Sequence, residues 1–246
     1  MPSIKFKTAK QWFKKLRDQL IDSLENLDTE KFVITEWDHK AQGGGKMSKL
    51  KSSVIEKGGV NISSVSGKFD EGMVGKIPGT DNDSSYKATG ISVVLHPSSP
   101  HIPSMHFNTR YLQTEQEWFG GGIDITPCLP YDDEKNYHSS LKEMCNKFNK
   151  SYYSEYKKWC DDYFYLPHRK ETRGIGGIFF DYLHSDDWGK DFDFIQAVGN
   201  FFHSFSVDTI KELVLCDKFK ISGAADGTFV TIGTSKVYIS ETRSAT

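Results

Sequence analysis

The run GISVVLHP at residues 90–97 decides the fold, and it is followed by HFNTRY at 106–111 and WFGGGIDITP at 118–127. β-Branched residues fill the first run, and its histidine precedes a proline, which favours extended backbone. The second run is predicted to be a strand, and so is the third, although its three glycines weaken a strand and indicate a bulge or a ligand close to the backbone. Outward from these runs, we predict further strands at 53–56, 60–65, 174–183 and 229–232, with loops at 40–46 and 75–85.

Three amphipathic segments are predicted to be helices, because their apolar residues recur at three- and four-residue steps. They cover residues 3–27, 132–165 and 192–205. The strands come in groups with helices between the groups, which favours a mixed α+β architecture with a largely antiparallel sheet. No repeat or linker divides the 246 residues, so we expect a single domain.

Composition excludes several classes of protein. The formal net charge is -2, so there is no overall positive charge to bind nucleic acid or an anionic membrane. The longest apolar runs are far shorter than a membrane span. The N-terminus lacks the basic-then-apolar order of a secretory signal, and the four cysteines are irregularly spaced, which is typical of reduced thiols. These features predict a soluble, cytoplasmic protein.

A first polar cluster lies at residues 92–110. On a strand, His106, Asn108 and Arg110 share one face, because side chains repeat every two residues. They then form one wall of a site, with Ser92 on the preceding strand. The alternative is an ordinary solvent-facing strand of an antiparallel sheet.

A second cluster places Arg169 and Arg173 before a glycine-rich segment that ends at Asp181. Guanidinium groups pair bidentately with carboxylates, so these arginines and Arg110 together can hold a ligand with several carboxylates. The alternative is an exposed basic turn. Neither glycine run has the spacing of a dinucleotide-binding or phosphate-binding loop.

Four histidines are conceivable metal ligands. No pair has the spacing of a known zinc motif, so the alternative is that the histidines have separate structural or catalytic roles. If they did bind a metal, a metal-dependent hydrolase would be a further alternative. The four are His96, His106, His138 and His168.

Taken together, these segments resemble the oxygen-dependent coproporphyrinogen III oxidases. The resemblance covers about two thirds of the chain in the family's order. It is carried by Gly43 to Gly45, Val54 to Ser63, Gly90 to Pro97, His106 to Tyr111, Trp118 to Pro127, Tyr156 to Asp161, Tyr163 to Leu166, His168-Arg169, Arg173 to Asp181 and Gln196 to Gly199.

The resemblance implies a broad, flat antiparallel sheet covered by helices on both faces, a homodimer, and coproporphyrinogen III as substrate. It implies that two propionates are converted to vinyl groups with dioxygen, giving protoporphyrinogen IX, carbon dioxide and hydrogen peroxide. It makes His106 a proton donor. The substrate contacts that it implies are Ser92, Asn108, Thr109 and Arg110, with Arg169 as a further cation. The four histidines become ligands of a divalent metal claimed only for some members.

The implied chemistry requires no organic cofactor, because a reduced pyrrole is electron-rich enough to react with dioxygen directly. Histidine then handles the proton of a bound peroxide, and Asp181 beside the apolar Phe179 and Phe180 acts on the pyrrole N–H. We therefore predict that His106, Asp181 and Arg173 are catalytic, and that a divalent metal is not required.

Two departures from the family pattern shape the expected activity. Asp181 is followed by Tyr182, where the family usually has a second aspartate, and the match fades beyond about Phe205. We divide the domain into an N-terminal helix at 1–31, a family-like core at 32–205 and a divergent, shortened segment at 206–246. The altered end predicts reduced efficiency, and the alternative is a catalytically impaired relative that binds porphyrins or acts as a dimerisation partner.

Overall fold

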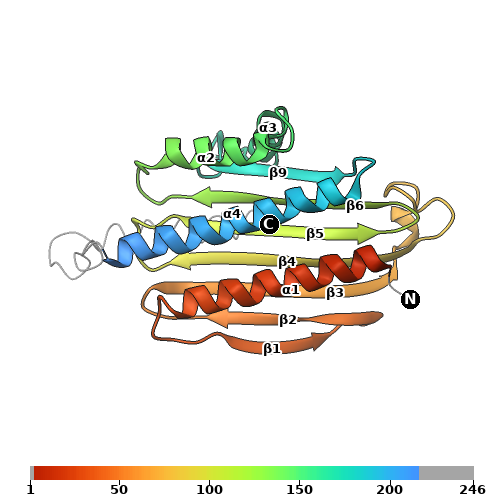
Figure 1. Cartoon of the computed structure of the whole chain (residues 1–246), viewed down its shortest axis with the longest axis horizontal. Coiled ribbons are helices and arrows are strands. Elements are labelled where there is room, and N and C mark those ends of the chain that lie inside the picture. The colour runs from red at the N-terminus through yellow and green to blue at the C-terminus, as the bar shows by residue number, and fades with distance from the viewer. Residues whose placement is uncertain (1–2, 216–246) are drawn as a thin grey trace.

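A computed structural model describes residues 3–215 of the chain. Its main feature is one seven-stranded sheet accompanied by four helices (Figure 1). The strands of this sheet are β1 (Val33–Asp38), β2 (Gln42–Leu50), β3 (Ile55–Lys68), β4 (Ser85–Pro97), β5 (Ser104–Gln113), β6 (Glu117–Thr126) and β9 (Gly176–Leu183). The helices are α1 (Ile4–Glu25), α2 (Glu134–Asn146), α3 (Tyr152–Tyr163) and α4 (Trp188–Leu215), with a short 3-10 turn η1 (Glu71–Met73) and a small hairpin of β7 (Tyr165–Leu166) and β8 (Glu171–Thr172).

The sheet is antiparallel throughout and has the order β1-β2-β3-β4-β5-β6-β9. The first six strands follow one another as a meander, since each pairs with the strand before it, and the longest connection, between β3 and β4, contains η1. Strand β9 joins β6 only after the chain has formed α2 and α3. The predicted single α+β domain with an antiparallel sheet is confirmed.

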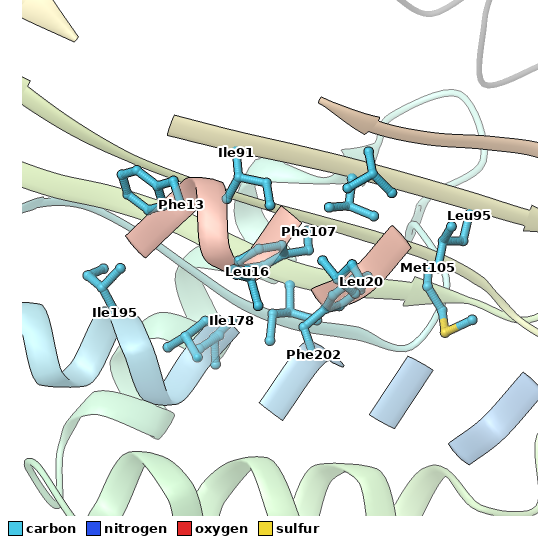
Figure 2. Packing of buried hydrophobic residues seen from close by; sticks show 14 of the residues in the cluster. Phe13, Leu16, Leu20, Ile91, Leu95, Met105, Phe107, Ile178, Ile195 and Phe202 are labelled. Atoms are coloured by element: carbon cyan, nitrogen blue, oxygen red, sulfur yellow. The ribbon is translucent and has the colours of Figure 1, made fainter. Parts of the chain in front are cut away.

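One face of the sheet carries the core. Helix α1 packs on β3 and β4, and α4 packs on β5 and β6, so the two helices lie across the same side (Figure 1). Phe107 of β5 stacks on Phe202 of α4 with ring centroids 4.9 Å apart. Figure 2 shows these rings together with Leu16 and Leu20 of α1 and Ile91 of β4. Burial of this continuous apolar layer is the main force that holds the helices on the sheet.

The opposite side of the sheet is called the open face here, and His106, Asn108 and Arg110 of β5 lie on it. In the central strands its side chains are half-buried or exposed, and α1 and α4 do not cover it. Helix α3 follows the β9 edge and contacts side chains of both faces, since Trp159 packs on Phe179 while Tyr156 packs on Phe180. Within residues 3–215, helical cover of the open face is therefore confined to this edge.

Three local predictions from sequence need correction. The expected loop at 40–46 is the first half of β2, in which Gly43 has a φ of +95°. The predicted strands at 53–56 and 60–65 are one continuous strand, β3. The predicted helix at 132–165 is divided into α2 and α3, because the side chain of Asn149 accepts a hydrogen bond from the Ser151 N–H just before α3 begins. The predicted strand at 229–232 lies outside the described residues.

No helix within residues 3–215 is long and apolar enough to cross a membrane.

Candidate active site

Strand β5 divides its side chains between the two faces of the sheet. Phe107, Thr109 and Tyr111 are buried toward the helices. His106, Asn108 and Arg110 are half-buried on the open face. The two-residue repeat of a strand therefore places these three polar groups on one wall, as the sequence predicts.

Arg110 makes an ion pair that crosses the sheet. Its Nη2 lies 2.5 Å from Oδ2 of Asp181, which is on β9. Strand β6 runs between the two and contributes Gly120 at this position. A Cβ at Gly120 would lie 2.4 Å from Asp181 Oδ1 and 3.2 Å from Arg110 Nη2, so only glycine leaves room for the pair. The carboxylate and the guanidinium therefore meet directly above the backbone of β6.

A second group of charges gathers around Asp124 of β6. Its Oδ2 accepts a hydrogen bond from Arg173 Nη2 at 2.7 Å and lies 3.3 Å from His106 Nδ1. The Asp124 side chain is only 5% exposed. Burial alone would raise the pKa of this carboxyl, but His106 and Arg173 outweigh burial and hold the pKa below its ordinary value. Asp124 is thus a buried anion that anchors two of the predicted catalytic residues.

His106 also contacts a second imidazole. Its Nε2 lies 3.2 Å from Nε2 of His96, and the two rings are nearly perpendicular. One of these nitrogens must carry the hydrogen if the contact is a hydrogen bond. The chain Asp124, His106, His96 therefore forms a line of titratable groups that runs outward from the buried carboxylate.

Arg173 is held from two directions. Besides its bond to Asp124, its guanidinium lies over the ring of Phe164, 4.1 Å from the centroid. Its Nε is buried and makes no hydrogen bond with the described protein atoms. A guanidinium has five N–H donors, so the fixed Arg173 keeps donors for an anionic ligand.

A hollow of about 360 Å³ lies on the open face beside the Arg110 pair. Ser92, Asn108 and Arg110 line it on one side and Trp37 on the other. A larger hollow, of about 530 Å³, lies between α1 and strands β1 to β3, with Lys7, Lys10 and Lys14 on its rim. Four predicted substrate contacts, Ser92, Asn108, Thr109 and Arg110, line the smaller hollow, so we take it as the candidate substrate site. His106, Asp181 and Arg173 do not line it, and Asp181 is linked to it through its ion pair with Arg110.

Two predicted substrate contacts differ from the others. Thr109 is among the residues that line the hollow, but its side chain is buried on the helix side, where its hydroxyl donates to the Gly120 carbonyl at 3.2 Å. Arg169 is exposed on the turn between β7 and β8, and its Nε donates to Glu171 at 2.6 Å. It lines a different hollow, together with Pro127 and Gly174. Of the three predicted cations, only Arg110 and Arg173 contact the charge clusters described above.

The structure does not bring the four histidines together. No group of three or more histidine, cysteine, aspartate or glutamate side chains within residues 3–215 is arranged to hold an ion. His138 uses both ring nitrogens, at 3.0 Å from the Ile175 carbonyl and 3.0 Å from the Tyr153 hydroxyl. Burial, together with nearby Lys157, lowers the pKa of this imidazole. His168 is exposed, so only His96 and His106 of the predicted set come together.

Among the charged residues of the two ion pairs, Arg110 with Asp181 and Arg173 with Asp124, only Asp124 was not predicted from sequence. The available signal was its position between Ile123 and Ile125 in an apolar strand, because a buried carboxylate requires a cationic partner. Which cation it meets depends on cross-strand register, which places His106 opposite Asp124.

Comparisons with known proteins identify the family of the chain. A sequence model of the family described as Coproporphyrinogen III oxidase matches residues 8–214. The oxygen-dependent coproporphyrinogen-III oxidases of Rickettsia akari (strain Hartford) and Rickettsia bellii (strain OSU 85-389) are each 49% identical to this chain over 199 residues. Each alignment covers 76% of this chain and 71% of the relative. Because the matched residues include α4, the whole sheet and every residue of the open-face clusters, the chain belongs to the coproporphyrinogen III oxidase family.

Proposed function

We propose that this chain catalyses the oxygen-dependent oxidative decarboxylation of two propionates of coproporphyrinogen III in haem biosynthesis. Each propionate arm, with one proton and one dioxygen, gives a vinyl group, carbon dioxide and hydrogen peroxide. The arm loses its carboxylate as carbon dioxide, and the carbon attached to the pyrrole loses one hydrogen. The two electrons released by this oxidation reduce dioxygen to peroxide. The product is protoporphyrinogen IX.

The observation that carries the proposal is the Arg110 and Asp181 pair beside the open-face hollow. A substrate with four propionates needs cations that are fixed in direction. Arg110 is fixed by Asp181, and Arg173 is fixed by Asp124 and Phe164. Each pair uses one terminal nitrogen, so both arginines keep donors for a propionate oxygen.

Proton transfer is assigned to Asp181 and His106. Asp181 accepts hydrogen bonds from Arg110 and from the Tyr182 N–H, so its surroundings are cationic and polar rather than apolar as predicted. As a carboxylate paired with Arg110, which lines the hollow, it is suited to accept the pyrrole N–H proton. His106 is suited to donate a proton to the departing peroxide, because Asp124 orients its ring from the buried side.

The reaction as proposed uses dioxygen as co-substrate and needs neither an organic cofactor nor a divalent metal. Its support is chemical, since an electron-rich reduced pyrrole supplies the electrons itself. We further propose a cytoplasmic homodimer, on the family resemblance, and sedimentation of the purified chain measures the oligomeric state.

The test is aerobic incubation of chelator-treated protein with coproporphyrinogen III, with vinyl products separated by chromatography and peroxide measured in parallel. The matched control is Arg110→Ala, which removes the cation at the hollow. We expect the wild-type chain to form product at least tenfold faster than the control, because a lost charge-assisted hydrogen bond costs about 1.5 to 3 kcal/mol. Product formed no faster than with Arg110→Ala would refute the enzymatic function and favour a non-catalytic porphyrin-binding relative.

A further inference from the structure

The edge strand β1 carries an exposed aromatic residue, Trp37, that has no role in the reaction proposed above. Strand β1 is at the edge of the sheet (Figure 1). All six of its residues are exposed, and Trp37 is 39% exposed. Lys46 and Glu36 form an ion pair at 2.6 Å on the helix side, where the neighbouring Ser48 binds Arg17 of α1. Because side chains alternate along a strand, Trp37 lies on the open face.

Trp37 and Arg110 stand at opposite ends of one row of cross-strand neighbours. The register pairs Trp37 with Gly45, Gly45 with Ser63, Ser63 with Gly90 and Gly90 with Arg110. Four strand spacings of about 4.8 Å separate the two ends, roughly 19 Å between their backbones. The same hollow of about 360 Å³ is lined by both end residues and by Ser63 and Gly90. Its floor therefore has no large side chain between the indole and the guanidinium.

The indole is held in place by a close contact with the strand beside it. A Cβ at Gly45 would lie 2.8 Å from two atoms of the Trp37 ring, so the ring rests directly against the backbone of β2. The ring is thus supported on one side, and Trp37 is partly exposed and lines this hollow as well as the larger one beside α1. A supported aromatic ring beside a flat floor presents a surface for another flat ring system.

We propose that Trp37 is a substrate-binding residue, whose indole packs against a pyrrole ring of the tetrapyrrole at the end of the hollow remote from Arg110. This inference rests on the proposed function. Arg110 binds a propionate at one end, and Trp37 contacts the macrocycle at the other, so the pair fixes the length and direction of the bound molecule. Trp37 takes no part in proton transfer, because an indole N–H is only a hydrogen-bond donor.

Two readouts test the inference, and the first of them requires no turnover. The first is the Kd for coproporphyrin III, the air-stable oxidised macrocycle with the same four propionates, measured by absorption titration. The second is the split between KM and kcat with coproporphyrinogen III. For Trp37→Leu we expect Kd and KM to rise about tenfold while kcat stays within about twofold, because a lost ring contact weakens binding without touching the reacting atoms. Trp37→Phe retains a ring and should restore most of the affinity.

The matched control is Ile34→Ala, on the same edge strand but on the helix side, and 51% exposed. It should leave Kd and KM unchanged. An unchanged Kd for Trp37→Leu, an equal loss in the control, or failure of the wild-type chain to bind coproporphyrin III would each overturn the inference. Trp37-dependent binding without product would leave the inference standing and refute the proposed activity. Full activity with unaltered KM in Trp37→Leu would support the proposed activity and refute the inference.

Discussion

Replacement of Asp124 by asparagine isolates the role of the buried carboxylate. The side chain keeps its shape, but Arg173 loses its anionic partner and His106 loses the charge 3.3 Å from its Nδ1. One charge-assisted hydrogen bond to a guanidinium is worth about 1.5 to 3 kcal/mol. Asparagine still accepts a neutral hydrogen bond, and the Arg173 side chain is 22% exposed and partly solvated. We therefore expect the free energy of unfolding at pH 7 to fall by about 2 kcal/mol.

The pH dependence of this difference follows from the direction of the pKa shift. His106 and Arg173 overcome the effect of burial and lower the pKa of Asp124 in the folded chain. The ionised carboxylate then stabilises the fold fully above the unfolded pKa of about 3.9, and this contribution is lost as pH falls through the folded value. The difference between the wild-type chain and Asp124→Asn should be constant from pH 7 to about 5 and should shrink below about 4.

Urea unfolding followed by circular dichroism measures this difference at each pH. With a slope of about 3 kcal/mol/M for a chain of this size, a loss of about 2 kcal/mol moves the midpoint by roughly 0.7 M. An unchanged midpoint at pH 7 would show that the paired carboxylate contributes nothing net. A difference that grows as the solution becomes more acidic would contradict the sign of the pKa shift.

Three further outcomes are expected. Gly120→Ala places a methyl group 2.4 Å from Asp181 Oδ1, so it should displace the Arg110–Asp181 pair and lower kcat/KM about tenfold or more. The control is Gly59→Ala, whose Cβ makes only an ordinary 3.5 Å contact with Asn61 Nδ2, and it should leave kcat/KM unaltered. Phe202→Ala should lower the free energy of unfolding by about 3 to 5 kcal/mol in urea titrations, because it removes a fully buried ring; a loss below about 1 kcal/mol would contradict the packing. Burial raises the pKa of the Cys160 thiol to about 12, so native protein at pH 8 should alkylate there far more slowly than unfolded protein by peptide mass mapping; equal rates would show that the thiol is accessible.

Local periodicity was enough to predict the strands from β3 to β6, β9 and one wall of the site, whereas β1 was not predicted. The alternation of His106, Asn108 and Arg110 follows from the geometry of any strand and does not depend on what surrounds it. The helix at 3–27 was predicted for the same reason, since its apolar stripe survives at three- and four-residue steps and α1 occupies residues 4–25.

Features that depend on neighbouring strands were not predictable from sequence. The glycines of β2 indicated a loop, because glycine is unfavourable in a strand, but cross-strand partners on both sides keep the segment extended. The Asp124 cluster depends on register between β5 and β6 and on the return of Arg173 after α3. The apolar surroundings expected for Asp181 were wrong because Arg110, distant in sequence, lies within 2.5 Å.

The long excursion between β6 and β9 gives the order in which a nascent chain can build this site. Strands β1 to β6 pair as each emerges from the ribosome, since every partner is the preceding strand. Until β9 has been synthesised, the glycine-rich edge of β6 has no hydrogen-bonding partner on its outer side. Both ion pairs, Arg110 with Asp181 and Asp124 with Arg173, join residues from opposite ends of this excursion. Translation must therefore pass Arg173 before its pair with Asp124 can form, and must pass Asp181 before Arg110 is held in place. A ribosome stalled before these residues carries an open sheet edge without a binding site.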